Sequence, residues 1–428
     1  MCHLILLQVC HGFYTPQQTR LNFVHRVVHD PRPSSCAAST STTDSAEQGQ
    51  TRRGPTPPPR RTGFGQKLLD FALQTPIWKY VMVPRARANI AKTAEANNVP
   101  WTSLKQWIKS KVNEETHPNL MEGMQQQIPE YYQAVAFHAY EEGNLCWDAA
   151  WDVEIASCAV GARNFPKYGS KGEDAFRDAF AQGLKEAGAK LPTSKHNVKI
   201  LDMGSGSGMS TRRLAKQYPQ ATNIIGMDLS PFFIAIGEKL LDLAPIESFH
   251  DNGPWVATIV PDERIEYQIG DIARTGYDDN TFDVVNLQFV LHELPTLAAY
   301  DVIDEAARIL KDDGGQFWIC EMDYESPYQA EVRANPLIFS LIRSTEPFLD
   351  EYAESIPSLF AYLQTKFDSI NVVAATGRHY ALVATMNRPQ EDGKNREKRG
   401  IITDLRFNDD GSYRLKDTHL KAWQSKEE

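Results

Sequence analysis

The chain has 428 residues, 42% of them hydrophobic, and a formal net charge of −10 at pH 7. This length suits two or three domains, or one domain with extensions. An acidic protein has no general electrostatic attraction to a phosphate backbone, so the charge disfavours nucleic acid as a partner. We also expect no transmembrane segment, because no apolar run approaches the roughly 20 residues that span a bilayer.

Residues 1–62 differ in composition from the rest of the chain. They include seven arginines, no lysine, three acidic residues and a stretch rich in serine and threonine at 34–45. Such Arg-rich, Ser-rich and acid-poor composition is typical of an organelle transit peptide. The alternative is an ordinary disordered tail. We therefore expect a plastid or mitochondrial location, or otherwise a cytoplasmic one.

Residues 63–190 are expected to be mainly helical. Leu104, Trp107 and Ile108 have the i, i+3, i+4 spacing of an amphipathic helix, and residues 145–163 repeat that pattern. No strand-like alternation stands out in this region. The sequence therefore predicts a helical N-terminal extension that acts as a cap or lid.

From residue 196 onward, short apolar runs alternate with longer helical stretches, which predicts strands and crossover helices. The expected strands are 198–203, 223–228, 265–269, 282–287 and 316–321. Strand–helix alternation indicates an α/β fold with a doubly wound, mostly parallel sheet, which we place at residues 191–388.

Two hairpins are expected toward the end of the chain. The runs 370–375 and 380–386 are joined at Gly377, which would put one antiparallel strand into the sheet. Residues 389–428 form a polar tail, in which Asn-Asp-Asp-Gly at 408–411 suits a second hairpin.

A glycine-rich turn follows the first expected strand. Gly204, Gly206 and Gly208 would let the backbone approach a ligand closely, with Ser205 in the same turn. Asp202 precedes the first glycine by two residues. A carboxylate there would repel a pyrophosphate but attract the ammonium and sulfonium charges of S-adenosylmethionine, directly or through water.

Acidic residues also follow the next two strands. Asp228 is placed to accept both hydroxyls of a ribose, with Leu229 beside it. Asp271 is placed to accept from the adenine amine, with Ile272 against the ring face. Each aspartate alone could be a turn residue, but three in register on consecutive strands point to an adenosyl cofactor. Gln288, at the end of the fourth strand, completes the expected cofactor-binding set.

These motifs resemble those of the class I S-adenosylmethionine-dependent methyltransferase family over roughly residues 196–388. The stretches that carry the likeness are 201–208, 226–230, 270–272, 282–294 and 307–315. The chain is most similar to the UbiE-like branch, which includes quinone-biosynthesis C-methyltransferases. Residues 137–147 resemble UbiE-like proteins of plants and algae, an organellar type. The resemblance implies a Rossmann-like sheet of seven strands whose last strand is antiparallel.

Three residues are candidates for the chemistry on a small-molecule acceptor with an O, C, N or S nucleophile. His292 follows the fourth strand and titrates near neutrality, so it is the first candidate base; alternatively it caps or packs the next helix. Glu293 is a less favoured base. His138 and Tyr140 lie in the helical region, which in this family can fold over the cofactor cleft; the alternative is that its aromatic residues pack in a core.

Other functions are less favoured. The six cysteines form no C-x-x-C pair and no cluster, which argues against zinc, disulfides and an arsenite methyltransferase. No metal site is expected, because Asp228, Asp271 and Asp283 each have a cofactor or strand-end role; a metal-assisted catechol enzyme is the less favoured alternative. The main alternative is a catalytically inactive module that keeps the fold as a scaffold or regulatory subunit. A nicotinamide dehydrogenase is disfavoured by Asp202.

Overall fold

The computed structural model describes residues 83–122, 124, 128–133, 140–192, 197–243, 259, 261–343, 345–387, 401–403, 405–408 and 413–415. The predicted transit peptide at 1–62 lies outside these residues, and so does His138.

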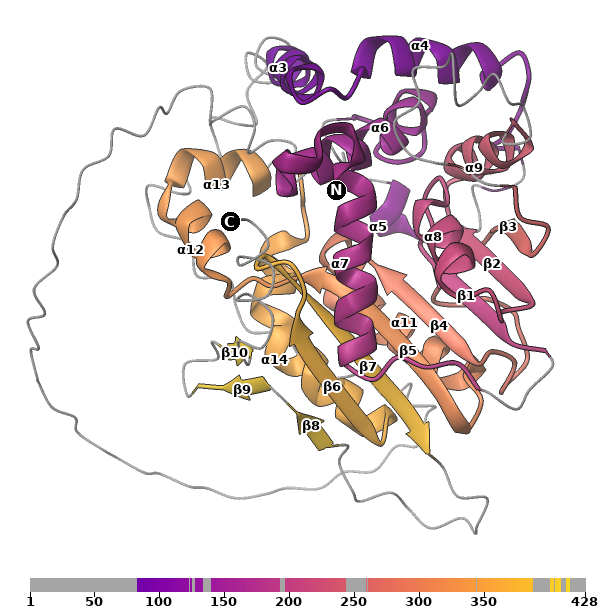
Figure 1. Cartoon of the computed structure of the whole chain (residues 1–428), viewed down its shortest axis with the longest axis vertical. Coiled ribbons are helices and arrows are strands. Elements are labelled where there is room, and N and C mark those ends of the chain that lie inside the picture. The colour runs from indigo at the N-terminus through magenta and orange to yellow at the C-terminus, as the bar shows by residue number, and fades with distance from the viewer. Residues whose placement is uncertain are drawn as a thin grey trace, which may run out of the picture.

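A central sheet of eight strands organises the molecule, in the order β3-β2-β1-β4-β5-β7-β6-β8 (Figure 1). The strands are β1 (Lys199–Met203), β2 (Asn223–Asp228), β3 (Ile265–Ile269), β4 (Val284–Gln288), β5 (Asp313–Met322), β6 (Ser369–Ala374), β7 (His379–Asn387) and β8 (Ile401–Thr403). The first five strands pair in parallel, whereas β7 is antiparallel to both β5 and β6. The predicted doubly wound, mostly parallel sheet of seven strands is thereby confirmed.

The end of the chain adds short strands that the family pattern does not contain. Strand β8 extends the sheet by pairing in parallel with β6. Strands β9 (Leu405–Phe407) and β10 (Tyr413–Leu415) form an antiparallel pair on either side of the turn predicted at 408–411. The hydroxyl of Tyr413 donates to Asp323 just after β5, at 2.8 Å. This contact attaches the tail to the end of the sheet that carries the strand-end loops.

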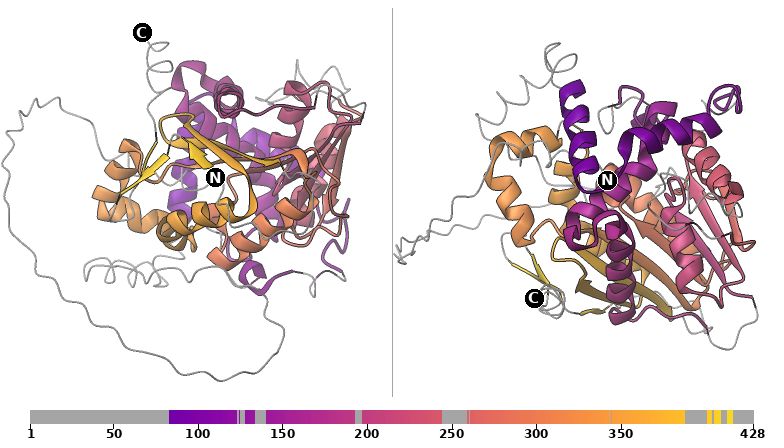
Figure 2. Two further views of the ribbon diagram at one scale, coloured as in Figure 1. Left: turned by 90° about the horizontal axis from the view of Figure 1, so that it is seen from below. Right: turned by 45° about the horizontal axis from the view of Figure 1, so that its top comes forward.

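Helices cover both faces of the sheet, which explains why its strands are nearly continuous apolar runs. Helices α7 (Gly172–Glu186), α8 (Met209–Gln217) and α9 (Pro231–Leu243) pack on one face, where Ile200 points. Helices α11 (Thr296–Ile309) and α14 (Leu349–Lys366) pack on the other face, where Leu201 points. Figure 2 shows the sheet between these two layers. Helices α12 (Pro327–Ala334) and α13 (Pro336–Arg343) follow β5.

The region before the sheet is helical, as its spacing predicted. It contains α3 (Val83–Ala96), α4 (Trp101–Lys111), the short α5 (Glu130–Gln133), α6 (Trp147–Asn164) and the 3-10 turn η2 (Pro166–Lys171). Figure 1 shows α3, α4 and α6 at the top of the molecule, beyond one end of the strands. Trp147 and Trp151 are under 10% exposed and pack with Phe232 and Phe233 of α9. These tryptophans therefore pack in a core between helices, which is the alternative that the sequence offered for the aromatic residues of this region.

Helices α6 and α7 cross at unusually close range. A Cβ atom added to Gly161 would lie 2.3 Å from the Cα of Glu173, and one added to Gly172 would lie 2.5 Å from the Cα of Ala162. Since real Cβ contacts are never that short, no side chain fits at either glycine. The crossing fixes Glu154 of α6 and Arg177 of α7 relative to the sheet, and both reach the candidate site. Among the residues that the structure describes, no helix is both long and apolar enough to cross a bilayer.

Candidate functional site

The glycine turn at the end of β1 lies at the switch point of the sheet, where β1 has β2 on one side and β4 on the other. Ligands of doubly wound folds bind at such a point. Gly204, Gly206 and Gly208 have φ values of 68°, 56° and 85°, which residues with a Cβ rarely adopt. A Cβ on Gly206 would meet no atom closer than Val153 Cγ2, at 4.0 Å. The backbone at Gly206 therefore borders open space, as a ligand-binding turn requires.

Four N–H groups of this turn, those of residues 204, 205, 206 and 208, are used within the protein. Those of Gly204 and Ser205 donate to Met227 O at 2.8 and 3.0 Å, and that of Gly208 donates to Ser205 O at 2.9 Å. The N–H of Gly206 donates to the carboxylate of Asp228 at 2.8 Å. A pyrophosphate-binding turn instead offers its N–H groups to the ligand. The geometry thus disfavours a dinucleotide. It supports the prediction from the sequence that this turn binds a cofactor without a pyrophosphate.

Asp202 is bonded within the protein. Its side chain is fully buried, and three side chains donate to it: Ser210 at 2.7 Å, Thr211 at 2.6 Å and Asn286 at 2.6 Å. Burial raises the pKa of Asp202, and these three hydrogen bonds oppose that rise. Because no part of the carboxylate is exposed, it does not face a ligand directly. Asp202 positions the turn by tying β1 to α8 and β4.

Asp228 and Ser205 present polar atoms next to the open backbone of Gly206. The two oxygens of Asp228 accept from the N–H groups of Gly206 and Ser230, both at 2.8 Å, and each keeps a free lone pair. Burial raises the pKa of Asp228 to about 6. The hydroxyl of Ser205 is buried and has no partner among the described residues. Buried polar groups normally have partners, so both residues fit a ligand with several hydroxyl groups, such as a ribose.

The remaining predicted cofactor residues lie beside Asp228. Asp228 and Ile269 are register partners at the ends of β2 and β3, and Gly270 N donates to Asp228 O at 3.0 Å. Asp271 is half-buried, and its Oδ1 accepts from Ala273 N at 2.9 Å. Leu229 and Ile272 are half-buried as well. The structure therefore brings the acidic and apolar strand-end residues to one edge, where they suit a ribose and an adenine ring.

Gln288 belongs to a buried polar network. Its Oε1 accepts from Arg177 at 2.6 Å, and its Nε2 donates to Asn286 Oδ1 at 3.2 Å. Arg177 also donates to Glu173 at 2.7 Å, and Asn286 donates to Asp202. This network links α7 to the strand ends of β4 and β1. Gln288 thus stands between the glycine turn and α7.

The helical region clamps the glycine turn from outside. Glu154 of α6 is fully buried and accepts from both Ser207 and Arg212. The hydroxyl of Ser230 donates to Asn144 O at 2.6 Å. The pKa of Tyr132 is raised above its usual value by burial and then by the charges of Asp228 and Glu293. Sequence reasoning missed Glu154. The amphipathic pattern of α6 does not show which of its residues will contact the glycine turn.

A strained corner follows β4. Phe289 has a φ of 59°, a conformation that costs a residue with a side chain on the order of 1–3 kcal/mol. Its ring stacks on Phe176 of α7, with centroids 5.7 Å apart, and contacts Phe180 and His379 edge-on. This aromatic cluster holds the corner, which turns the chain from Gln288 into the 3-10 turn η3 (Leu291–Glu293).

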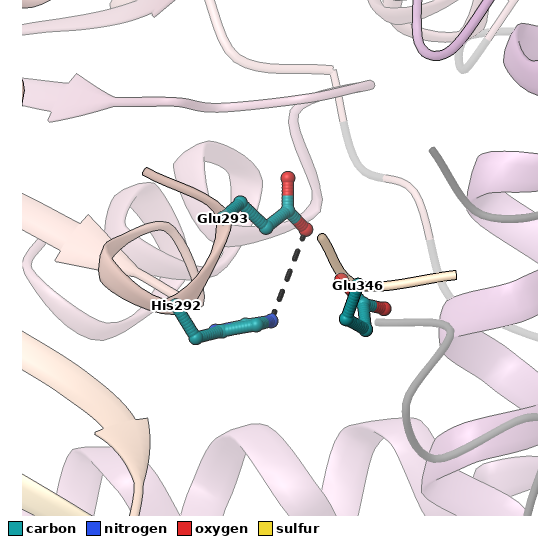
Figure 3. A group of neighbouring side chains, drawn as sticks. All are labelled: His292, Glu293 and Glu346. Carbon is teal, nitrogen blue, oxygen red and sulfur yellow. Dashed lines mark ion pairs between the residues drawn. The ribbon is translucent and has the colours of Figure 1, made fainter. Parts of the chain in front are cut away.

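His292 lies on η3 and is 1% exposed. Its Nδ1 is 2.8 Å from Oε1 of Glu321, a fully buried residue at the end of β5. Its Nε2 has no hydrogen-bond partner among the described residues. Burial lowers the pKa of His292, but the charge and hydrogen bond of Glu321 outweigh this effect and raise it. Figure 3 shows Nε2 directed toward the carboxylates of Glu293 and Glu346. The histidine is thus oriented by Glu321 and presents Nε2 to this side of the site.

Tyr140 is bonded to charged residues of the helical region. Its hydroxyl donates to Asp152 at 2.5 Å, and the guanidinium of Arg87 lies 4.3 Å from its ring centroid. Asp152 also accepts from Lys105 at 2.9 Å. Tyr140 is therefore part of a charged cluster that joins α3, α4 and α6, and its catalytic role stays a prediction. His138 lies outside the described residues.

Comparison with known proteins agrees with this geometry. Residues 201–318 match the family model described as “Methyltransferase domain”. This part of the chain is therefore similar to methyltransferase domains. The matched stretch runs from β1, through the glycine turn and the three strand-end aspartates, to the middle of β5. The cofactor that its strand-end residues fit is S-adenosylmethionine.

Named relatives cover part of the chain. A demethylmenaquinone methyltransferase of Lactobacillus johnsonii is 33% identical over 145 residues, which are 33% of this chain and 52% of that protein. The arsenite methyltransferase of Homo sapiens is 23% identical over 188 residues, 44% of this chain and 48% of that protein. The chain thus spans about half the length of these curated relatives. A SAM-dependent methyltransferase of Aquifex aeolicus is 16% identical with a TM-score of 0.32, and that match covers 53% of this chain and 98% of the solved one.

Proposed function

We propose that the protein transfers a methyl group from S-adenosylmethionine to a small-molecule acceptor. The observation that carries this proposal is the glycine turn, whose N–H groups are used internally while Gly206 borders open space beside Asp228. A turn of this kind suits an adenosyl ligand without phosphate. When bound, the cofactor supplies a methyl group made electrophilic by its sulfonium.

The residues of this chain divide the work between two neighbouring groups. Ser205, Asp228 and Asp271 would hold the adenosyl group, as their free polar atoms allow. His292 and Glu293 lie beyond the corner at Phe289, on the acceptor side. The charges of Asp228 and Glu293 both raise the pKa of Tyr132. Alignment of the acceptor with the methyl group would supply much of the rate enhancement.

The acceptor class is a finer proposal. Several relatives are named demethylmenaquinone methyltransferases, which favours a quinone-like or similar aromatic acceptor. A relative named arsenite methyltransferase suggests another acceptor. Against it, the three described cysteines, Cys146, Cys158 and Cys320, are unpaired, and the last two are buried. We also propose a plastid or mitochondrial location from the composition of residues 1–62; imaging a C-terminal fluorescent fusion with and without residues 1–62 would test it.

Calorimetry with S-adenosylmethionine on the full chain tests the cofactor. We expect binding of S-adenosylmethionine and its demethylated product and none of NADH, whereas the reverse would refute the proposal. Binding without transfer to any acceptor in a labelled-methyl screen of quinones, phenols and cell-extract fractions would favour the inactive-scaffold alternative.

A matched pair of glycine variants sharpens this test. Gly206→Val puts a side chain into the open space of the turn, and we expect it to abolish binding. Gly314→Val is the control, because Gly314 has a similar φ of 77° with no atom near its Cβ position, but it lies at the start of β5, at the opposite end of the sheet. Normal binding by Gly206→Val would show that the cofactor lies elsewhere.

A further inference from the structure

We propose that His292, Glu293 and Glu346 bind a divalent metal ion on the acceptor side of the site. Binding of the ion itself depends only on these residues, while its part in methyl transfer rests on the proposed function. The sequence predicts no metal site, because Asp228, Asp271 and Asp283 each have a cofactor or strand-end role. Glu346 comes from the segment between α13 and α14, which no motif marks.

The three side chains converge in the way a metal site requires. One ligand atom of each, Nε2 of the histidine and a carboxylate oxygen of each glutamate, lies within 4.8 Å of the other two. The distance from His292 Nε2 to Glu293 Oε1 is 4.0 Å. Ligands at about 2.1 Å from a tetrahedral ion are about 3.4 Å apart. A closure of about 1 Å, within reach of glutamate side-chain rotation, would complete the site (Figure 3).

The histidine is prepared as a ligand. Its Nδ1 lies 2.8 Å from Glu321 Oε1, so a proton on Nδ1 is donated to that carboxylate and the lone pair is left on Nε2. Metal-binding histidines almost always donate their other ring N–H to a carboxylate or carbonyl in this way. Nε2 is buried and has no hydrogen-bond partner among the described residues. An ion at this point would satisfy it.

The charges favour a cation as well. Glu346 is 1% exposed, and the side chain of Glu293 is 19% exposed. Two carboxylates gathered beside one buried histidine nitrogen concentrate negative charge there, which attracts a cation. One imidazole and two carboxylates suit Mn²⁺, Fe²⁺ or Zn²⁺ better than Ca²⁺, which takes oxygen ligands alone.

Three protein ligands leave coordination positions open, which is the pattern of catalytic rather than structural metal sites. An open position next to the methyl-transfer site suits a hydroxyl oxygen of the acceptor, whose acidity a metal ion increases. The inference therefore narrows the acceptor to a hydroxylated compound, such as a phenol or hydroquinone, and the transfer to oxygen. A metal-free site would instead leave His292 available as a base.

Direct binding of Mn²⁺ and Zn²⁺ to the full chain tests the site. The protein is first treated with a chelator and dialysed, and each ion is titrated by calorimetry, with the paramagnetic signal of free Mn²⁺ as a second readout. We expect one strong site for the wild type, and at least tenfold weaker binding for Glu346→Gln and His292→Ala. Glu321→Gln should weaken binding 10- to 100-fold through the orientation of the histidine. Glu331→Gln, an exposed glutamate on α12, is the matched control and should bind normally.

The outcomes separate this inference from the proposed function. If wild type binds S-adenosylmethionine but neither ion, the metal site is refuted and the proposed function stands. The site is also refuted if the ions bind equally well to wild type and Glu346→Gln, because the ligands would then be elsewhere. Thermal unfolding of each variant shows whether it is folded; Glu346→Gln keeps the shape of the side chain, so it remains informative if His292→Ala does not fold.

Discussion

The two halves of the candidate site are built in different ways. The cofactor half, at the ends of β1, β2 and β3, consists of backbone turns held by short hydrogen bonds, such as Gly206 N to Asp228. The acceptor half, at the ends of β4 and β5, consists of buried side chains from distant segments, such as His292 and Glu321. In a site formed by backbone, few substitutions fit, so its preference for one ligand is hard to change. A side-chain site is easily altered, so specificity for the acceptor is expected to reside there.

Asp202→Ala tests whether Asp202 holds the glycine turn of the cofactor half in place. We expect this variant to lose the most stability. The change leaves the buried donors of Ser210, Thr211 and Asn286 without an acceptor. We expect the free energy of unfolding to decrease by about 3–5 kcal/mol. Urea denaturation measures the loss. If stability were unchanged while cofactor affinity fell, Asp202 would act on the cofactor directly and not by positioning the turn.

Glu321→Gln tests the acceptor half alone. We expect the rate of methyl transfer to fall about 10- to 100-fold, because the amide no longer fixes His292 as the carboxylate does. The dissociation constant for S-adenosylmethionine, measured by calorimetry, should stay within about twofold. A parallel loss of cofactor affinity would mean that the two halves are one coupled unit.

The cofactor half should respond to pH through Asp228. Because the pKa of Asp228 is about 6, its carboxylate is protonated as the pH falls below that value and accepts hydroxyl groups less well. Affinity for S-adenosylmethionine should then fall, by up to about tenfold per pH unit. The stability of the ligand-free protein should instead increase as the pH falls. The pKa of Asp228 is raised in the folded state, so protonation of Asp228 stabilises the fold.

Asp228→Asn provides the comparison for this pH dependence. Its affinity should be weaker than that of the wild type at pH 7.5 and nearly independent of pH between 5 and 7. Calorimetry over this range measures both proteins. An equally steep pH dependence in the variant would assign the effect to another group, such as Glu293 or Asp202, whose charges also act on Asp228.

Tyr140→Phe should have the smallest effect. It removes one hydrogen bond to Asp152, which keeps Arg87 and Lys105 as partners, so we expect a loss of about 1 kcal/mol in stability. The catalytic rate constant should not change. A large drop in that rate, with stability preserved, would restore Tyr140 as a catalytic residue.

What the sequence could reveal follows the same division. The strands, the glycine turn and the aspartates after β1, β2 and β3 are local patterns, and the structure places them at one edge as expected. Side-chain partners are not local. Arg177 and Gln288 are 111 residues apart in the chain, and His292 and Glu321 are 29 apart. Nothing in a single sequence selects such pairs among the many arginines and glutamates on helices, since only the packing of α7 and β5 brings them together.

The close crossing of α6 and α7 bears on how this protein could be divided or recombined. The stretch that matches the methyltransferase-domain model begins at residue 201, after both helices. Yet these helices supply two residues that contact the site. Glu154 of α6 accepts from Ser207 of the glycine turn, and Arg177 of α7 donates to Gln288. A fragment cut at the start of the match would keep every signature residue and lose the side chains that hold them. A fragment that keeps the site intact must therefore begin at or before α6. The junction of a chimera should likewise lie before α6.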